Sequence, residues 1–503
     1  MISEDLRADM EKRQIDVDLS LALLERIRAG AADAEPPAQA RGIPGVDGSR
    51  VVDTTTPPDF TADAVSISER LDALGLSAAA MGLEIPRTGT CVLSKEQLHV
   101  IGMHLVPKTA YGVLNGGSAT SYADTTKNEG FSPELYALYT DLLGTVGEQV
   151  RGTAKGLTPA LFGRDGTPGP SFLELKMRHL LLLLAECSRS HGVQIPADHV
   201  PMFQMTSVHN NEEVQRAYDA YRTSPLLADL IERTGVDITR VRTGVQPMIC
   251  AFTHSNDGTP RQVFDHAYGE PGRTLPLPGG HGQSFSVLKS TYQDMHAAGF
   301  RFAYIGNVDN LGYTMDPVSL AYFALSGRPA AFEFAYKTPV DVKGGILIED
   351  THRGLTCGDI GPAVSRSYVE QAEQAGTPIL FNCATGLFDL EWLTRNLSRI
   401  EHELPLRVSD QDKDAGRYSQ AEQVTWEVIG MIDNPLIFAV DKYRRFLAAK
   451  LLSESFMTNA VYLDHPEFPS DPDPSRDLKG TAEKLHTGLK GLLTDVYRLP
   501  DRD

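Results

Sequence analysis

The central part of the chain alternates between short apolar segments and helical patterns, and this alternation constrains the fold more than any other feature. Helical patterns such as those at 171–192 and 211–223 lie between several of the apolar segments. The segments that read as buried strands are 110–114, 200–208, 300–308, 330–336, 344–350 and 377–384. This alternation predicts an α/β fold with a mostly parallel central sheet. A site is then expected at the carboxyl ends of the strands, where neighbouring loops converge.

The flanks of this central part have a different character. Residues 1 to about 30 predict one helix and are followed by a Pro- and Gly-containing linker. A second short helix is expected near Ser66, which with Glu69 forms a possible capping box. We therefore expect an N-terminal helical region with linker at 1–95, a main domain at 96–462, and a tail at 463–503 that holds a loop and one short helix.

Composition excludes several classes of protein. The 503 residues are 41% hydrophobic and 22% charged, which is ordinary for a soluble globular chain. A net charge of -19 argues against nucleic acid as a partner. The five cysteines fit no metal-binding spacing, so we expect reduced thiols and a cytoplasmic location. The first residues lack the apolar stretch of a signal peptide, and the apolar run 180–185 is too short to span a membrane.

Glycines and polar residues follow several of the predicted strands. Leu114–Gly117 supplies backbone N–H groups that could hold a phosphate, although a hairpin turn explains the same residues equally well. His281 lies between two glycines in a tight loop, where it could donate to a phosphate or a sugar hydroxyl or simply be a loop histidine. Asn307 and Asp309 follow an apolar strand, and a strand-end carboxylate suits Mg²⁺ bound to phosphates. An Asx-type turn is the alternative there.

The order of these motifs resembles that of a known family. The matching segments are Leu114–Gly117, Gly280–Gly282, Asn307–Gly312, Asp341–Gly345, Phe381–Asn382 and Arg445–Lys450. Over about residues 110–460, the chain resembles the eukaryotic-type UTP–glucose-1-phosphate uridylyltransferase group of the UDP-sugar pyrophosphorylase family.

The resemblance implies a GT-A-like, Rossmann-type nucleotidyltransferase domain. The implied reaction joins UTP and a sugar 1-phosphate into a UDP-sugar and pyrophosphate, by Mg²⁺-assisted in-line attack on the α-phosphorus. The catalytic residues that it implies are Lys155, Lys450 and Asp309, with Asp309 also holding the metal. The implied nucleotide-binding residues are Leu114, Asn115, Gly116, Gly117, Met205, Gln246 and Gly280. The implied sugar-binding residues are His281, Asn307, Glu333, Gly345 and Asn382.

The glycine-rich loop departs from the family pattern by an insertion. The family's lysine follows the loop closely, whereas here the nearest lysine, Lys127, lies in an unpatterned polar stretch. Lys155, upstream of the intact 171–178 segment, resembles the family's lysine better, which makes 122–151 an insert. Ser132 and Pro133 predict a helix start inside the insert, and we expect the insert to be a surface lid.

Other departures keep alternatives open. Ala119 replaces a loop glycine, and Ala384 replaces an asparagine in the region that contacts the hexose in the family. Glucose 1-phosphate is the expected sugar substrate, because the histidine of the 280–282 turn favours glucose or galactose, whereas the acetylhexosamine branch of the family usually has asparagine there. A UDP-N-acetylglucosamine or broad UDP-sugar pyrophosphorylase remains an alternative, as does a nucleotide-binding paralogue without catalysis. The family's C-terminal β-helix has no counterpart pattern after residue 460, so no oligomeric state is expected from the resemblance.

Overall fold

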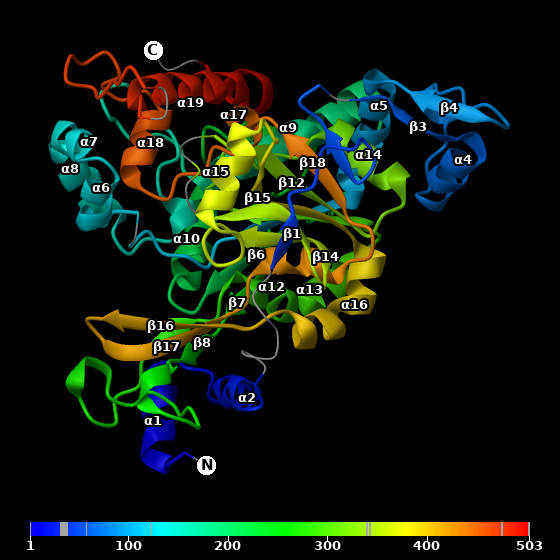
Figure 1. Cartoon of the computed structure of the whole chain (residues 1–503). Helices are drawn as coiled ribbons and strands as arrows, with labels where there is room; N and C mark the ends of the chain where they lie inside the picture. Colours follow the sequence, from blue (N-terminus) through cyan, green and yellow to red (C-terminus); the bar gives the residue numbers. More distant parts are fainter. Residues whose placement is uncertain are drawn as a thin grey trace.

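A mixed sheet lies at the centre of the computed structural model, which describes residues 2–30, 39–56, 58–120, 122–338, 341, 344–473 and 476–500 (Figure 1). The strand order is β2-β18-β12-β15-β11-β5-β6-β7, and β13 joins at β15 and pairs with β1 and β14. The strands are β1 (Ala40–Gly42), β2 (Val51–Asp53), β5 (Thr109–Leu114), β6 (Met202–Ser207), β7 (Arg242–Gln246), β11 (Phe302–Asn307), β12 (Ala330–Tyr336), β13 (Gly345–Asp350), β14 (Gly354–Asp359), β15 (Leu380–Asp389) and β18 (Leu436–Val440).

Most of the neighbouring strands in this order are parallel. β11, β5, β6 and β7 pair in parallel, as do β12, β18 and β2, whereas β15 runs antiparallel to both β11 and β12. The carboxyl ends of β11, β5, β6 and β7 therefore lie at one edge of the sheet. The predicted α/β class with a mostly parallel sheet is confirmed, and β12 spans the predicted residues 330–336.

Helices cover both faces of the sheet, because each face is apolar and must be buried. On one face lie α5 (Lys95–Leu105), α9 (Phe172–His191), α10 (Asn211–Tyr221), α11 (Ala228–Thr234) and α14 (Pro317–Ser326), which share the largest apolar core. On the other face lie α12 (Ser284–Val287), α13 (Lys289–Ala297) and α16 (Leu390–Glu403). Ser171 begins α9 as predicted, since its hydroxyl accepts from the backbone N–H of Glu174.

The insert folds as three helices that pack on the C-terminal part of the chain (Figure 1). These helices are α6 (Thr125–Phe131), α7 (Pro133–Leu138) and α8 (Thr140–Val150), and they face α18 (Leu452–Thr458) and α19 (Leu478–Leu492). Ser132 caps α7 and Pro133 is its first residue, as predicted. The expected surface lid is wrong in one respect: Leu135 and Tyr139 are fully buried in this second core, so the insert is an integral part of a lobe.

Strands also occur in the segment predicted as helical at the N-terminus. Its helices are α1 (Glu4–Lys12), α2 (Val17–Arg28) and α4 (Ala64–Ala73), and its strands beyond β1 and β2 are β3 (Phe60–Asp63) and β4 (Thr90–Leu93). The single helix expected over residues 1–30 is broken at Gln14, whose φ of 59° is incompatible with a right-handed helix. The expected capping box at Ser66 is also wrong, because Asp63 caps α4 three residues earlier.

A lower lobe carries α1 and α2 together with small sheets (Figure 1). These contain β8 (Met248–Cys250) with β10 (Pro276–Pro278), and β9 (Phe252–Thr253) with β16 (Arg407–Lys413) and β17 (Gly416–Glu422). Two further α-helices of the described ranges are α15 (Arg366–Gln374) and α17 (Lys442–Arg445), and α17 contacts the C-terminal helix α19.

Two further observations concern the cysteines and the helices. All five cysteines are buried and unbridged. Across the described ranges, none of the helices combines the length and apolar character that crossing a membrane requires.

Candidate functional site

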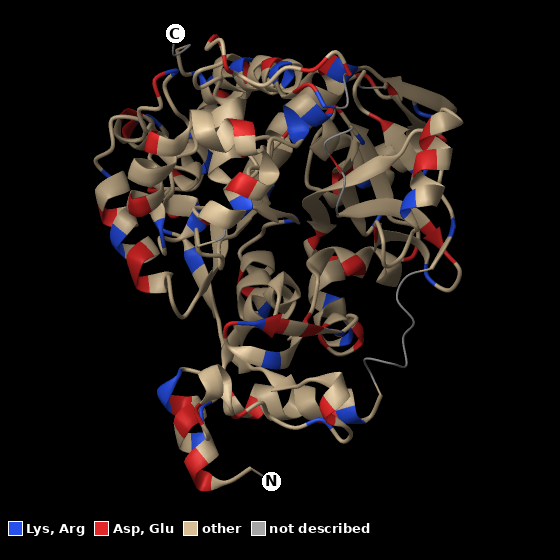
Figure 2. Cartoon of the chain, turned by 60° about the vertical axis from the view of Figure 1, so that its left-hand side comes forward, with Lys and Arg blue, Asp and Glu red and all other residues tan. Residues whose placement is uncertain are grey.

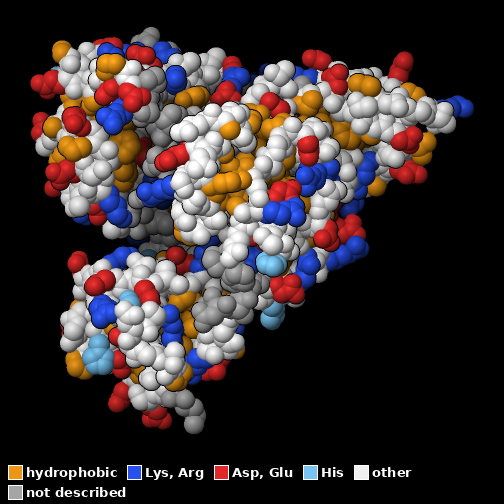
Figure 3. Space-filling model, viewed as in Figure 1, with side chains coloured by type: hydrophobic (Ala, Val, Ile, Leu, Met, Phe, Trp, Pro, Cys, Tyr) orange, Lys and Arg blue, Asp and Glu red, His pale blue; other side chains and the backbone are white. Residues whose placement is uncertain are grey.

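A cavity of about 490 Å³ lies at the carboxyl ends of β5, β6, β7 and β11. Figure 3 shows the molecule hollowed on this side, between the lobe that carries the insert and the lower lobe. The predicted residues that line the cavity are Leu114, Gly116, Gly117, Lys155, Met205, Gln246, Gly280, His281, Asn307 and Asp309. Residues up to 195 positions apart in the sequence thus meet in one cavity because parallel strands end at one edge of the sheet.

Asn115 lies directly behind the cavity and ties the glycine-rich loop to its neighbours. Its backbone N–H donates to the carbonyl of Met205 at 2.8 Å, and its carbonyl accepts from Asn210 Nδ2 at 3.0 Å. Its Oδ1 accepts the backbone N–H of Gly156 at 2.9 Å, beside Lys155. A side chain at Gly156 would place a Cβ 2.6 Å from that Oδ1, so glycine is needed for this close approach. Asn115 therefore positions the glycine loop and the lysine segment relative to each other.

Gln246 is held in a fixed orientation at the end of β7. Its Nε2 donates to the carbonyl of Gly280 and to Gln283 Oε1, both at 2.8 Å. Both amide protons are therefore used within the protein, and Oε1 is left as the acceptor. Oε1 lies 2.8 Å from the position that a Cβ on Gly116 would take. The glycine loop and the glutamine thus form one wall of the cavity.

Lys155 is buried, and its ammonium group rests on an aromatic ring. Its Nζ lies 3.0 Å from the ring centroid of Tyr122 and has no hydrogen-bond partner within the described part of the chain. Burial lowers the pKa of Lys155 to about 7, while the negative charges of Asp309 and Glu454 oppose that shift. The backbone N–H of Lys155 donates to the carbonyl of Gly117 at 3.0 Å, which joins the lysine to the glycine loop across the insert.

Lys127 occupies a different place. It lies on the exposed surface of α6 and is absent from the cavity lining. The structure thus brings Lys155, and not Lys127, to the glycine loop.

His281 presents a neutral imidazole to the cavity. The backbone N–H of Thr425 donates to its Nδ1 at 3.1 Å, which leaves the proton on Nε2. Burial, together with the positive charges of Arg407 and Lys450, lowers the pKa of His281 to about 4. The side chain is therefore a neutral donor at physiological pH.

Asp309 is the carboxylate of the cavity and follows β11 directly. In the described residues, no three His, Cys, Asp or Glu side chains converge as a metal-binding group. One carboxylate fits Mg²⁺ nonetheless, because Mg²⁺ in phosphate sites usually takes one or two carboxylates and completes its shell with phosphate oxygens and water. The donor set is consistent with a metal that would arrive with its phosphate ligand.

A buried lysine supports the turn that carries Asp309. Lys176 of α9 is fully buried, and its ammonium donates to the carbonyls of Asn310 and Tyr313, the latter at 2.8 Å. Burial lowers the pKa of Lys176 strongly, and the charge of Arg445 adds to that effect. Lys176 is not among the residues that line the strand-end cavity, so it acts through the backbone that follows Asp309.

Besides Asn115, four predicted residues lie outside the cavity lining. Glu333 is buried within β12, where it pairs with Arg445 at 2.5 Å and accepts from Thr385 at 3.0 Å. Gly345 and Asn382 neighbour each other across β13 and β15, next to Cys357. Lys450 is exposed at the start of α18, and its positive charge contributes to the lowered pKa of His281.

Sequence reasoning missed several residues that shape the site. The additional lining residues are Ser118, Gly152, Ser207, His209, Asn210, Met248, Pro276, Pro278 and Val308. Ser207, His209 and Asn210 follow directly on Met205, so a strand-end rule applied to β6 would have found them. Tyr122 had no such signal, because its contact with Lys155 depends on how the insert folds.

A comparison with known proteins is consistent with this geometry. The UTP–glucose-1-phosphate uridylyltransferase family model matches residues 167–481, which is more than half of the chain and begins after the glycine loop. The UTP–glucose-1-phosphate uridylyltransferase of Encephalitozoon cuniculi is 38% identical over 237 residues, 44% of this chain and 47% of that protein. A probable UTP–glucose-1-phosphate uridylyltransferase of Schizosaccharomyces pombe is 24% identical over 65% of this chain and 59% of that protein. The chain thus spans about half the length of these relatives.

Solved structures show the same fold. The UDP-glucose pyrophosphorylase of Leishmania major aligns with a TM-score of 0.54 at 15% identity, over 91% of this chain and 79% of that one. The uridine diphosphate N-acetylglucosamine pyrophosphorylase of Trypanosoma brucei aligns with a TM-score of 0.54 at 16% identity, over 80% of each chain. Because the family model covers most of the sheet and its strand-end motifs, this chain belongs to the UTP–glucose-1-phosphate uridylyltransferase family.

Proposed function

We propose that the chain transfers a uridylyl group from UTP to glucose 1-phosphate, releasing pyrophosphate and UDP-glucose. The observation that carries the proposal is the cavity in which Lys155, Asp309, Gln246 and His281 meet. In the reaction, a phosphate oxygen of the sugar attacks the α-phosphorus of UTP, and the bond from that phosphorus to the pyrophosphate oxygen breaks. Two anions must be brought together, so positioning and positive charge supply most of the catalysis.

Gln246 and the glycine loop would select the base. Because both Nε2 protons of Gln246 are used within the protein, its Oε1 can only accept. Uracil has an N–H at position 3, whereas cytosine has a bare nitrogen there. An acceptor fixed at this place therefore favours uracil, and glycine at position 116 leaves that acceptor uncovered, because a Cβ there would lie 2.8 Å from Oε1.

Lys155 and Lys450 would neutralise the phosphates. In the cavity, Lys155 has a pKa of about 7 and an ammonium without a hydrogen bond, so phosphate oxygens would hold its proton more firmly. Lys450 lies close enough to influence His281, and both Lys450 and Lys155 interact electrostatically with Glu454 of α18. A charge-assisted contact in a site shielded from water is worth more than the same contact in solution.

Asp309 would hold Mg²⁺, and Lys176 would keep the following turn in place. The metal, when bound, would supply positive charge to the phosphate oxygens. The Nε2–H of His281 would donate to the sugar or its phosphate, with Asn307 in the lining of the same cavity. Gly345 and Asn382, which neighbour each other outside the lining, would contact the hexose. A cytoplasmic location is also proposed, supported by the unbridged cysteines.

A pyrophosphate-release assay tests this function. The purified chain is mixed with UTP, Mg²⁺ and a panel of sugar 1-phosphates that includes glucose and N-acetylglucosamine. We expect turnover with glucose 1-phosphate and none when CTP replaces UTP. Turnover with N-acetylglucosamine 1-phosphate alone would move the chain to that branch. UTP binding without turnover of any sugar would identify a non-catalytic paralogue.

A further inference from the structure

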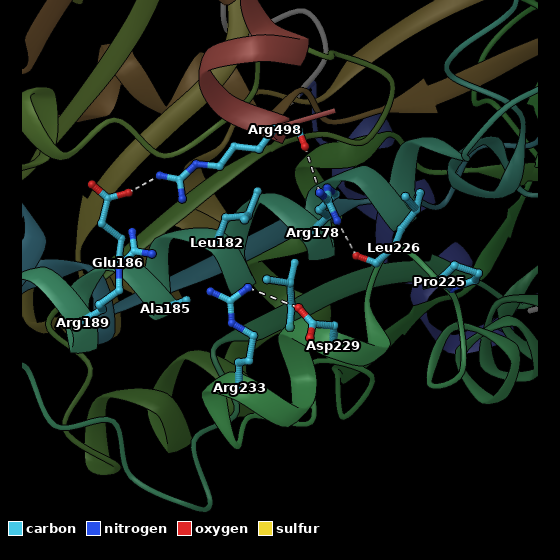
Figure 4. A pocket seen from close by; sticks show the side chains of 11 residues that line it. Arg178, Leu182, Ala185, Glu186, Arg189, Pro225, Leu226, Asp229, Arg233 and Arg498 are labelled. Atoms are coloured by element: carbon cyan, nitrogen blue, oxygen red, sulfur yellow. Dashed lines mark hydrogen bonds and ion pairs between the residues drawn. The ribbon is translucent and has the colours of Figure 1, made fainter. Parts of the chain in front are cut away.

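A second pocket, of about 460 Å³, lies between α9, α11 and the turn that follows the C-terminal helix (Figure 4). It shares no lining residue with the strand-end cavity. Its charged residues are Arg178, Arg189, Arg233 and Arg498, with Glu186 and Asp229. Figure 4 shows the four guanidinium groups around Leu182. The pocket thus has two more positive than negative side chains on a chain of net charge -19.

The local sequence explains how the arginines reach one place. Arg178, Leu182, Glu186 and Arg189 lie three or four positions apart on α9 and therefore share one face of that helix. Arg233 comes from α11, which packs beside α9. Arg498 has a left-handed backbone with φ of 47°, which turns the chain back toward α9 after Tyr497.

Among the four arginines, only Arg178 uses its guanidinium group to hold together separate parts of the backbone. Arg178 donates to the carbonyls of Tyr497 and Leu226 at 2.7 Å and of Arg498 at 3.0 Å. Its role is to hold the C-terminal turn on α9. It also lends positive charge to the pocket.

The other three arginines have weak partners or none. Arg233 pairs with Asp229 of its own helix at 3.2 Å, with both side chains more than half exposed. Arg498 pairs with Glu186, and Arg189 has no hydrogen bond or ion pair in the described ranges. The Arg233–Asp229 pair is exposed and the Arg498–Glu186 pair is partly exposed, and ion pairs open to solvent contribute little to stability, so a stronger acceptor can replace these carboxylates.

The positive charges of the arginines in this pocket also repel one another. Burial lowers the pKa of Arg178, and the nearby charge of Arg498 lowers it further. Lys and Arg are otherwise interspersed with Asp and Glu over the chain (Figure 2). A bound dianion would relieve a repulsion that the two carboxylates compensate only in part.

We propose that this pocket is a second, separate binding site for a small soluble phosphate ester. Arginine favours phosphate because its planar fork matches two phosphate oxygens at once. Leu182, Leu226 and Pro225 add an apolar surface that a bare phosphate would leave uncovered. The ligand is therefore a phosphate joined to an apolar group, and phenyl phosphate is a suitable probe.

Equilibrium dialysis with phenyl phosphate and with inorganic phosphate tests the site. The test variant is Arg189→Gln with Arg233→Gln, and the matched control is Arg216→Gln with Arg240→Gln, which removes the same charge from exposed positions outside both cavities. We expect the test variant to bind phenyl phosphate about a hundredfold more weakly, roughly tenfold for each arginine, while the control binds like the wild type. Phenyl phosphate should bind several-fold more tightly than inorganic phosphate.

The comparison isolates this pocket, because phosphate held in the strand-end cavity would be unaffected by either variant. The test variant should keep its circular dichroism spectrum and its pyrophosphate-release activity, since neither arginine belongs to the catalytic cavity. Equal binding by the wild type and the test variant would overturn the proposal, as would equal loss in the control variant. Sedimentation of the chain with phosphatidic-acid vesicles, lost in the test variant, would overturn the assignment to a soluble ester.

Discussion

Two regions of the molecule meet at Lys155, and they are built on different principles. The strand-end region consists of the loops after β5, β6, β7 and β11, whose geometry follows from a parallel sheet. The insert lobe consists of α6 to α8 packed on α18 and α19. The backbone of Lys155 is tied to Gly117 of the first region, and its ammonium lies against Tyr122 where the second begins. The loops at the sheet edge therefore fix the position of Lys155, and the insert lobe provides the aromatic surface on which its ammonium group lies.

Deleting the insert should have the largest effect. Replacement of residues 125–147 by a short Gly-Ser bridge is expected to abolish cooperative unfolding or leave insoluble protein, because Leu135, Tyr139 and Val146 are buried in the shared core. Each such side chain contributes about 1.5–3 kcal/mol. Thermal unfolding followed by circular dichroism checks this. As control, Tyr139→Phe loses only the hydroxyl bond to Val461 and should cost about 1 kcal/mol. A wild-type melting curve for the deletion would show that the lobe folds without the insert.

The strand-end region is tested by Asp309→Asn. We expect kcat to fall by about a hundredfold or more, because the cavity would lose the carboxylate that is proposed to hold Mg²⁺. Rates are measured over a series of Mg²⁺ concentrations, with the exposed Asp294→Asn as control. Near-normal turnover at limiting Mg²⁺ would refute the metal assignment.

Lys155→Ala addresses the point where the two regions meet. The loss of a phosphate-binding cation should lower kcat about 30-fold, and lower it more than it raises KM. Lys127→Ala should leave both parameters unchanged, since Lys127 lies on the exposed face of α6. Steady-state kinetics at saturating UTP distinguishes the two lysines. The reverse pattern would mean that the glycine loop uses the lysine of the insert.

Substitution of Lys155 should lower activity but raise the stability of the fold. Lys155 has a pKa of about 7 in the folded chain, below its unfolded value of about 10.4, so the wild type gains stability as pH rises from about 7 to about 10. Lys155→Met removes the buried charge and should stabilise the chain by about 2 kcal/mol below pH 7. The gain should shrink toward pH 10. Urea unfolding at several pH values measures it, and a gain independent of pH would contradict the buried-charge explanation.

Substitution of Ala384, which lies in β15 of the central sheet, should have the smallest effect on stability. Ala384 has φ of 52°, a left-handed conformation that asparagine adopts more readily than alanine. Ala384→Asn should raise stability by about 0.5 kcal/mol, and Ala384→Val should lower it because a β-branched residue fits this conformation poorly. Differential scanning calorimetry can rank the three variants. A more stable valine variant would show that the strain is absent.

Much of the central sheet and of the helices that cover it follows from local sequence patterns. β12 and α9 were predicted almost residue by residue, because a continuous apolar run and a capped amphipathic pattern are local signals. The edge strand β2 and the hairpin of β16 and β17 were missed, since short or polar strands form only where a partner strand is present. The single N-terminal helix failed at Gln14, where a backbone turn has no composition signal.

The sequence by itself determined the α/β class, the strand-end motifs and the choice of Lys155 over Lys127 as the counterpart of the family's lysine. These depend on hydrophobic periodicity, caps and motif order, all of which are local or ordered along the chain. Only the tertiary structure decided that the insert is core, that Tyr122 covers Lys155, and that Glu333 pairs with Arg445 outside the cavity. Each of these contacts joins residues from separate elements, so its energy depends on packing and desolvation that no local stretch of sequence encodes.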